Sequence, residues 1–174
     1  YKLMTIFPEL NIMIIVLFSG VITALVGILF GLPSLRIKGF YLAVATLASQ
    51  FFLIWLFNKV PWFYNYSDTG QITVSERTMF GVAVTGANAP SYATYLFCLI
   101  LVVGLGFAAK NMIRSKIGRS WMAIRDMDIA AEIIGVSPLK TKLSAFAISS
   151  FYIGIAGSLY FAVYLGALEV TESF

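Results

Sequence analysis

The sequence predicts an all-α integral membrane protein, a polytopic helical bundle, and two observations carry that prediction. Of the 174 residues, 60% are hydrophobic and only 11% are charged, whereas a soluble globular domain is about 45–50% apolar and about 25% charged. Four uncharged stretches are also long enough to cross a bilayer, which takes about 20 helical residues. Lipid offers no partner to a free backbone amide, so each crossing segment is expected to be a helix.

The four predicted transmembrane helices alternate in direction across the bilayer. They cover residues 10–32, 40–57, 91–109 and 143–168. The two longer connections between them are an outer loop over 58–90 and a cytoplasmic loop over 110–142. The chain opens at Tyr1 without an initiator methionine and closes at Phe174 without a polar tail. We therefore expect it to be a fragment of a single, longer transmembrane domain.

The basic residues divide unequally between the two sides of the membrane. With four crossings, the segments 33–39 and 110–142 share one side and hold nine of the 12 Lys and Arg residues. The other side holds only Lys2, Lys59 and Arg77. Basic residues concentrate in cytoplasmic loops, so this asymmetry predicts that the first side is cytoplasmic and that the outer loop and both ends face outward. Topology thus explains the net charge of +4 without a nucleic-acid-binding patch.

The outer loop begins with a cluster of aromatic side chains, namely Trp62, Phe63, Tyr64 and Tyr66. Rings with a polar edge favour the headgroup layer of a membrane, so the cluster is either an interfacial belt or part of a gate for a ligand. Beyond it, residues 67–70 are expected to form a turn. Residues 72–83 are expected to form a small hairpin or lid.

The groups that carry enzyme chemistry are missing from the sequence. It has no histidine, and the four predicted spans hold no Asp, Glu, Lys or Arg. Proton-driven carriers and voltage sensors need an ionisable group inside the membrane, so its absence argues against both. No nucleotide-binding lysine loop, nucleophile elbow or zinc-binding helix motif occurs, and Cys98 alone makes no disulfide framework. We predict no catalytic residue, no metal site and no cofactor.

Small and weakly polar side chains are the functional candidates inside the spans. The set in the second span is Thr46, Ser49 and Gln50. These residues are expected to line a polar path for a substrate, or, for Gln50, to hydrogen-bond a neighbouring helix. The set in the last span is Ser150, Gly154 and Ser158, which recur every four residues on one helix face and predict close helix packing. The first span offers its own small residues, namely Ser19, Gly20, Thr23 and Gly27.

The cytoplasmic loop is predicted to contain a short capped helix. Asp126 or Asp128 can accept hydrogen bonds from the free amides of a first turn, which caps a helix running to Ile134. Gly135 supplies a left-handed C-cap, and the Ser137-Pro138 pair opens the next helix. The result is either a rigid knob that docks into a partner's cleft or an ordinary solvated connection.

Ala130, Ala131 and Gly135 form the pattern Ala-Ala-x-x-x-Gly. This pattern resembles the cytoplasmic coupling motif of ATP-binding cassette (ABC) importer permeases, in which Glu precedes the two alanines; Ile129 takes that place here. Three longer blocks are similar to the branched-chain amino acid permease family, LivM type: residues 31–48, 118–131 and 141–150. They stand in the family's order, and the resemblance covers roughly residues 27–170.

The resemblance implies a permease subunit of a bacterial inner-membrane ABC importer that moves branched-chain amino acids inward. Its implied partners are cytoplasmic ABC ATPase subunits, a second, LivH-like permease subunit, a periplasmic substrate-binding protein and the surrounding lipid. Small residues in this loop let the ATPase approach closely. The residues expected to couple the chain to it are Arg125, Asp126, Asp128, Ala130, Ala131 and Gly135. The alternatives are a urea or short-amide ABC permease, an ATP-independent channel or secondary carrier, and a purely structural membrane subunit.

Overall fold

The computed structural model describes residues 1–36, 40–63, 66, 71–74, 76–79, 82–86 and 89–169. Its helices are α1 (Lys2–Ile6), α2 (Ile12–Arg36), α3 (Phe40–Lys59), α4 (Ser91–Arg114), α5 (Lys116–Asp126), α6 (Asp128–Ile133) and α7 (Pro138–Leu159). A π-helical segment, η1 (Tyr160–Leu165), continues α7, and the strands are β1 (Gln71–Thr73), β2 (Arg77–Met79), β3 (Val82–Thr85) and β4 (Ala167–Glu169).

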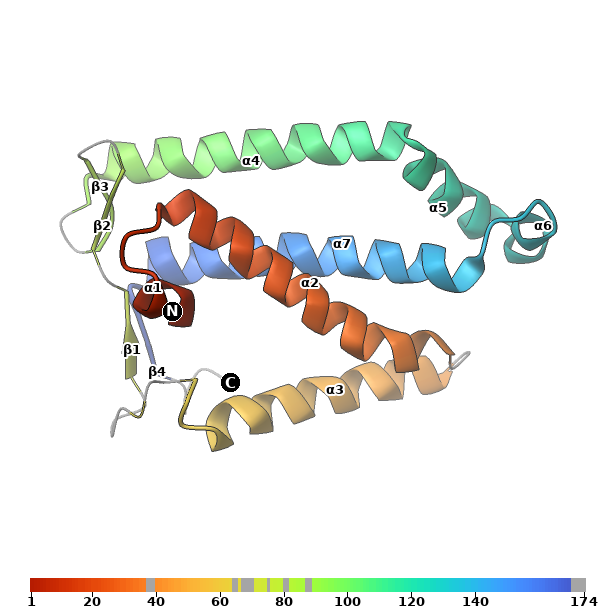
Figure 1. Cartoon of the computed structure of the whole chain (residues 1–174), viewed down its shortest axis with the longest axis horizontal. Helices are drawn as coiled ribbons and strands as arrows, with labels where there is room; N and C mark the ends of the chain where they lie inside the picture. The colour runs from red at the N-terminus through yellow and green to blue at the C-terminus, as the bar shows by residue number, and fades with distance from the viewer. Residues whose placement is uncertain are drawn as a thin grey trace.

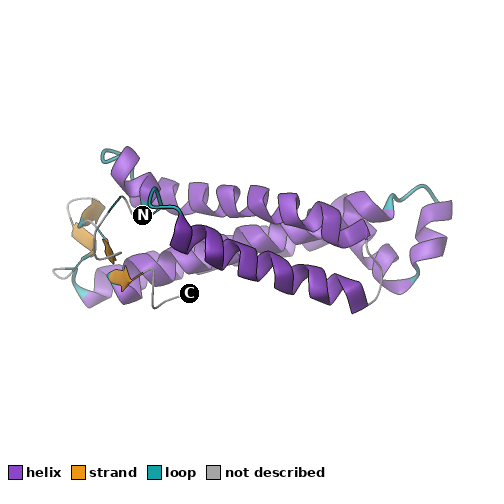
Figure 2. Cartoon of the chain, turned by 90° about the horizontal axis from the view of Figure 1, so that it is seen from below, coloured by secondary structure: helices purple, strands orange, loops and turns teal. Residues whose placement is uncertain are grey.

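Helices α2, α3, α4 and α7 extend along the long axis of the molecule (Figure 1). Figures 1 and 2 both place the strands and the N-terminus at one end and α6 at the opposite end. The predicted helical membrane fold is confirmed. Two short two-stranded sheets in the described residues add to it at one end, and the sequence pattern had indicated only a hairpin there.

Three helical stretches in the described part of the chain are long and apolar enough to cross a membrane: Ile12–Pro33, Ser91–Arg114 and Pro138–Leu165. In α3, the stretch Ala43–Lys59 is a shorter apolar helix. The first stretch starts two residues later than predicted, because the Asn11 side chain caps α2 by accepting a hydrogen bond from Met13 N at 3.1 Å. Helix α4 continues past the predicted end at residue 109 to Arg114, so its cationic last turn lies beyond the uncharged run.

The last predicted span, residues 143–168, differs from the structure at both ends. The helix begins earlier, at Pro138, which occupies its first turn as predicted. It ends at Leu165, because Gly166 has a φ of +66°, a left-handed conformation that interrupts a right-handed helix. The next residues form β4, which pairs with β1 in antiparallel register, Ile72 opposite Leu168.

The predicted hairpin over residues 72–83 is only partly present. Strands β2 and β3 pair as an antiparallel hairpin, but β1 pairs with β4 instead of β2. One reason is that Arg77 ties β2 to the N-terminal segment: its guanidinium donates to Met4 O at 2.7 Å and to Pro8 O. The predicted turn at residues 67–70 lies outside the described residues.

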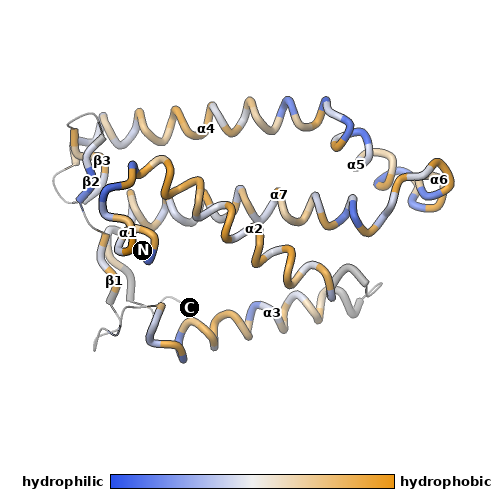
Figure 3. The backbone as a smooth tube through the Cα atoms, in the orientation of Figure 1, coloured by the Kyte–Doolittle hydropathy of each residue, from blue (hydrophilic) through white to orange (hydrophobic). Residues whose placement is uncertain are grey.

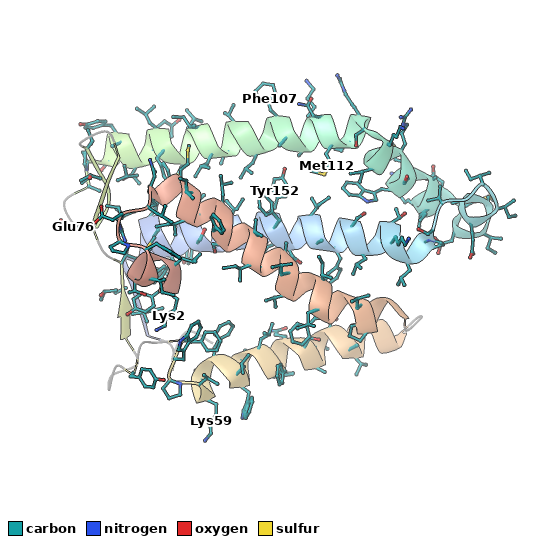
Figure 4. All side chains as sticks on the ribbon, in the orientation of Figure 1. Lys2, Lys59, Glu76, Phe107, Met112 and Tyr152 are labelled. Carbon is teal, nitrogen blue, oxygen red and sulfur yellow. The ribbon has the colours of Figure 1, made fainter. Side chains whose placement is uncertain are left out.

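The apolar surface of the bundle is largely exposed within the chain itself. The buried core is small and lies where α1, α2, α4 and α7 meet, around Ile12, Val16, Phe97 and Ile155. Figure 3 shows apolar residues along the long helices and hydrophilic residues gathered around α5 and the end of α4. In Figure 4, Phe107 projects from α4 away from α7. Such exposed apolar surface suits lipid or further membrane helices as neighbours.

Candidate functional site

A cavity of about 680 Å³ lies between α2, α3 and α7. Its polar lining comes from all three helices: Thr23, Thr46, Ser49, Gln50 and Ser150. The rest of its lining is apolar: Val26, Gly27, Phe30, Leu53, Ile54, Phe57 and Phe146. The structure thus brings the three polar residues of the second predicted span together in one cavity, and it adds one hydroxyl from each opposing helix.

Three hydroxyl groups in the cavity already donate to their own helices. Thr23 Oγ1 donates to Ser19 O at 2.9 Å, and Thr46 Oγ1 donates to Ala43 O at 2.8 Å. Ser49 Oγ donates to Ala45 O, also at 2.8 Å. A hydroxyl has one hydrogen to donate and two lone pairs that can accept. These oxygens therefore face the cavity as acceptors.

Gln50 and Ser150 stand apart from the other polar lining residues. Within the part of the chain that the structure describes, neither side chain has a hydrogen-bond partner. Gln50 carries two N–H donors and one acceptor oxygen. Gln50 is exposed and Ser150 half-buried within the chain, so both side chains are accessible to a ligand or to a neighbouring subunit.

The small residues predicted for packing lie where α7 crosses α2. A Cβ atom added to Gly154 would stand 2.6 Å from Thr23 Cβ, and one added to Gly27 would stand 2.7 Å from Ser150 Cβ. Real Cβ atoms do not approach that closely, so both positions require glycine. Ser158 Oγ donates to Ile155 O of its own helix at 2.8 Å, and close packing at this position stays a prediction.

The segment opposite the strands connects α4 to α7 through two short helices. Ser115 caps α5, since Ser115 Oγ accepts from Ile117 N at 3.2 Å. Trp121 then joins α5 to α7, because its indole Nε1 donates to Ser144 Oγ at 2.9 Å. Gly118 lies against the end of α4, where an added Cβ would stand 2.5 Å from the carbonyl carbon of Ile113.

Helix α6 lies close to its predicted position but begins differently. Asp128 is its first residue, and Met127, not Asp126, occupies the N-cap. The Asp128 carboxylate is instead bound by Lys142 Nζ of α7 at 2.5 Å. Asp126 pairs with its neighbour Arg125 at 3.0 Å on the exposed surface. Gly135 has the predicted left-handed conformation, with a φ of +90°.

Only one of the two alanines that were expected to face a partner is exposed within the chain. Ala131 is 2% exposed, because α6 packs through it against α5 and α7. Ala130 is exposed. Four large apolar side chains are exposed here beside Glu132: Met127 at 69%, Ile129 at 78%, Ile133 at 81% and Ile134 at 74%. We call these four residues the α6 tip.

Comparison with known proteins identifies the family to which the chain belongs. The family model described as "Branched-chain amino acid transport system / permease component" matches residues 2–171. The chain belongs to the branched-chain amino acid permease family. Membership confirms the resemblance carried by the three sequence blocks, and with the three long apolar helices it assigns the chain to the inner membrane as a multi-pass segment.

Two relatives of this permease segment are each named "High-affinity branched-chain amino acid transport system permease protein LivM", one from Salmonella typhimurium and one from Escherichia coli. Each is 32% identical over 164 residues, which is 83% of this chain and 38% of the relative. The chain therefore spans less than two fifths of the length of these relatives. No solved structure matches it.

Several residues that shape this permease segment were not singled out as site residues from the sequence. Trp121 and Lys142 join α5 and α6 to α7. Thr23, which the sequence offered only as a small residue of the first span, completes the polar lining of the cavity. Spacing along one helix does not show these links, because the partners are 23 residues apart for Trp121–Ser144 and 14 apart for Lys142–Asp128.

Proposed function

We propose that this chain is the core of a permease subunit in an ABC importer that moves branched-chain amino acids inward across the bacterial inner membrane. The observation that carries the proposal is the uncharged cavity between α2, α3 and α7 in a chain of the branched-chain amino acid permease family. Its lining is mainly apolar, which favours an aliphatic side chain over urea or a short amide. Both curated relatives are named for branched-chain amino acid transport.

The chain transports without catalysing a reaction in this proposal. ATP is hydrolysed in cytoplasmic ATPase subunits, and a periplasmic binding protein delivers the substrate to a pore shared with a second permease subunit. The described residues hold no group of three or more His, Cys, Asp or Glu that would suit a metal ion. The chemistry of the segment is then the binding and release of a substrate by side chains that move with their helices.

The α6 tip is the surface proposed to dock into an ATPase subunit. Exposed isoleucines on a short helix bury apolar area when they enter a partner's cleft, which contributes about 25 cal/mol per Å². Arg125 and Asp126 flank the tip and remain exposed. Ala130 is exposed beside the tip, whereas Ala131 is buried where α6 packs against its own chain.

Contacts within the chain connect the α6 tip to the cavity. Asp128 of α6 binds Lys142, and Trp121 of α5 binds Ser144, both near the start of α7. One to two turns further along α7, Phe146 and Ser150 line the cavity. A displacement of α6 by a closing ATPase is thereby transmitted along α7 to the substrate.

We test docking with Ile133→Glu in the complete importer, with Ile133→Leu as the matched control. A charge at the centre of the α6 tip is expected to reduce both ATPase co-purification and ATP-dependent leucine uptake into membrane vesicles at least tenfold. The leucine variant keeps the apolar surface and should behave as the wild type. Normal uptake by Ile133→Glu would contradict coupling through α6, and uptake that needs no ATP would favour a channel or secondary carrier.

A further inference from the structure

The two charges of a free amino acid are difficult to accommodate in an uncharged cavity. Its ammonium and carboxylate are both charged, yet none of the residues that line the cavity is ionisable. Burying an isolated charge without compensation is very costly. Among the described residues, the polar side chains that line the cavity and can replace water around the substrate are Thr23, Thr46, Ser49, Gln50 and Ser150.

The polar side chains on α3 differ in what they offer a ligand. On α3, the Thr46 and Ser49 hydroxyls donate to carbonyls of their own helix, so their oxygens offer lone pairs. Lone pairs suit an ammonium group. The free N–H donors come from the Gln50 amide, which has no partner within the described residues. Such donors suit a carboxylate.

The spacing on α3 matches a substrate that carries both groups on one carbon atom. Thr46 and Gln50 are four residues apart, so they lie on the same face of the helix. Four residues at a rise of about 1.5 Å each separate the two positions by about 6 Å along the helix axis. Hydrogen bonds from two such positions converge on the ammonium and carboxylate of a single α-amino acid.

We propose that the cavity binds a zwitterionic α-amino acid in one orientation, with its carboxylate on the Gln50 amide and its ammonium on the oxygens of Thr46 and Ser49. This inference rests on the proposed function and adds the roles of individual residues to it. The apolar lining around Phe30, Leu53 and Ile54 then receives the side chain of the substrate. Without an ionisable lining residue, a substrate that carries a net charge is excluded.

The experiment uses the complete importer in proteoliposomes with leucine-loaded binding protein at saturation. Leucine uptake and stimulated ATP hydrolysis are measured together. Gln50→Glu keeps the size of the side chain but places a second carboxylate beside that of leucine, so uptake should fall at least tenfold. Thr46→Val removes the acceptor and should reduce uptake similarly, whereas Thr46→Ser keeps it and should restore most of the uptake.

The control variant is Ser149→Ala. Ser149 is next to Ser150 on α7 and its hydroxyl also donates to its own helix, at 3.0 Å to Phe146 O, but it does not line the cavity. It should transport leucine normally. In the cavity variants, ATP hydrolysis should remain stimulated, because the α6 tip is unchanged; a misfolded complex would instead lose both activities.

The outcomes separate this inference from the function on which it rests. If the wild type imports leucine and Gln50→Glu and Thr46→Val do so equally well, the orientation is wrong and the permease function stands. If both variants lose ATP hydrolysis together with uptake while yield falls, the residues are structural and the inference is also overturned. If the wild-type complex hydrolyses ATP but imports no branched-chain amino acid, the proposed function itself fails.

Discussion

Two glycines of α7 differ sharply in the space around them. Gly154 faces α2, where an added Cβ would stand 3.1 Å from the Cα atom of Gly20 and closer still to Thr23. Gly157 has no heavy atom within 4 Å of the corresponding position. The two residues belong to the same helix, so helix propensity affects them alike and only the surroundings differ.

Gly154→Leu is therefore expected to destabilise the permease by about 1–3 kcal/mol, the usual effect of overfilling a packed site. Gly157→Leu should change the free energy of unfolding little. Thermal unfolding of the purified importer in detergent measures both. Gly154→Ala is expected to be destabilising as well, because the first added carbon already overlaps Thr23. Equal stability of the two leucine variants would show that α2 and α7 do not pack as described.

Helices α4 and α5 meet at a corner in which the backbones of the two helices touch. Ser115 ends α4 and caps α5, and Gly118 is buried against the last turn of α4. Trp121 lies one turn beyond Gly118 on α5 and binds Ser144. The direction of α5, and with it the position of α6, is thus set by how closely Gly118 approaches Ile113.

Gly118→Ala is expected to open this corner, because its Cβ would meet the backbone of Ile113, which has no freedom to rotate away. Leucine uptake should fall several-fold while the helices stay inserted in the membrane. Ser120→Ala is the matched control, since it removes only a hydroxyl bonded to Lys116 O of its own helix. Membrane yield and vesicle uptake are the measurements, and normal uptake by Gly118→Ala would contradict a tight corner.

The whole molecule separates its charges along the long axis. The loop rich in Lys and Arg forms α5, α6 and the start of α7 at one end, and the strands with Arg77 lie at the other (Figure 1). In the bilayer, the basic end is predicted to be cytoplasmic. In the same orientation the α6 tip faces the cytoplasm, where the proposed ATPases act. The exposed aromatic residues Trp62 and Tyr66 then lie near the outer interface.

Cysteine labelling in intact cells tests this orientation on a Cys98→Ser background in a transporter without other reactive cysteines. Tyr66→Cys is expected to react with a membrane-impermeant thiol reagent, because Tyr66 is 71% exposed at the outer end. Lys116→Cys should react only after the cells are opened. Labelling of Lys116→Cys from outside would reverse the topology and remove the α6 tip from the reach of any cytoplasmic partner.

Several features of this protein follow from local sequence alone. Long uncharged runs form helices because lipid leaves the backbone no other hydrogen-bond partner. Gly135 ends a helix with positive φ, and Pro138 begins one, because these residues have backbone preferences of their own. The resemblance to the family is also readable in the linear order of its blocks. The membrane helices and their ends depend on neighbours within a few residues.

Other features were decided only by tertiary structure. The sequence showed Thr46, Ser49 and Gln50 as polar residues in an apolar span, but the cavity exists because α2 and α7 lie opposite them. Ala131 is buried and Ile133 is exposed because α6 packs on α5 and α7. The residues of α6 alone do not reveal which of its faces turns toward those helices. Strand β1 pairs with β4, although Ile72 and its partner Leu168 lie about half the chain apart in sequence. The physical reason is the same each time: these contacts join segments distant in sequence, and their free energy depends on how whole helices rotate and cross.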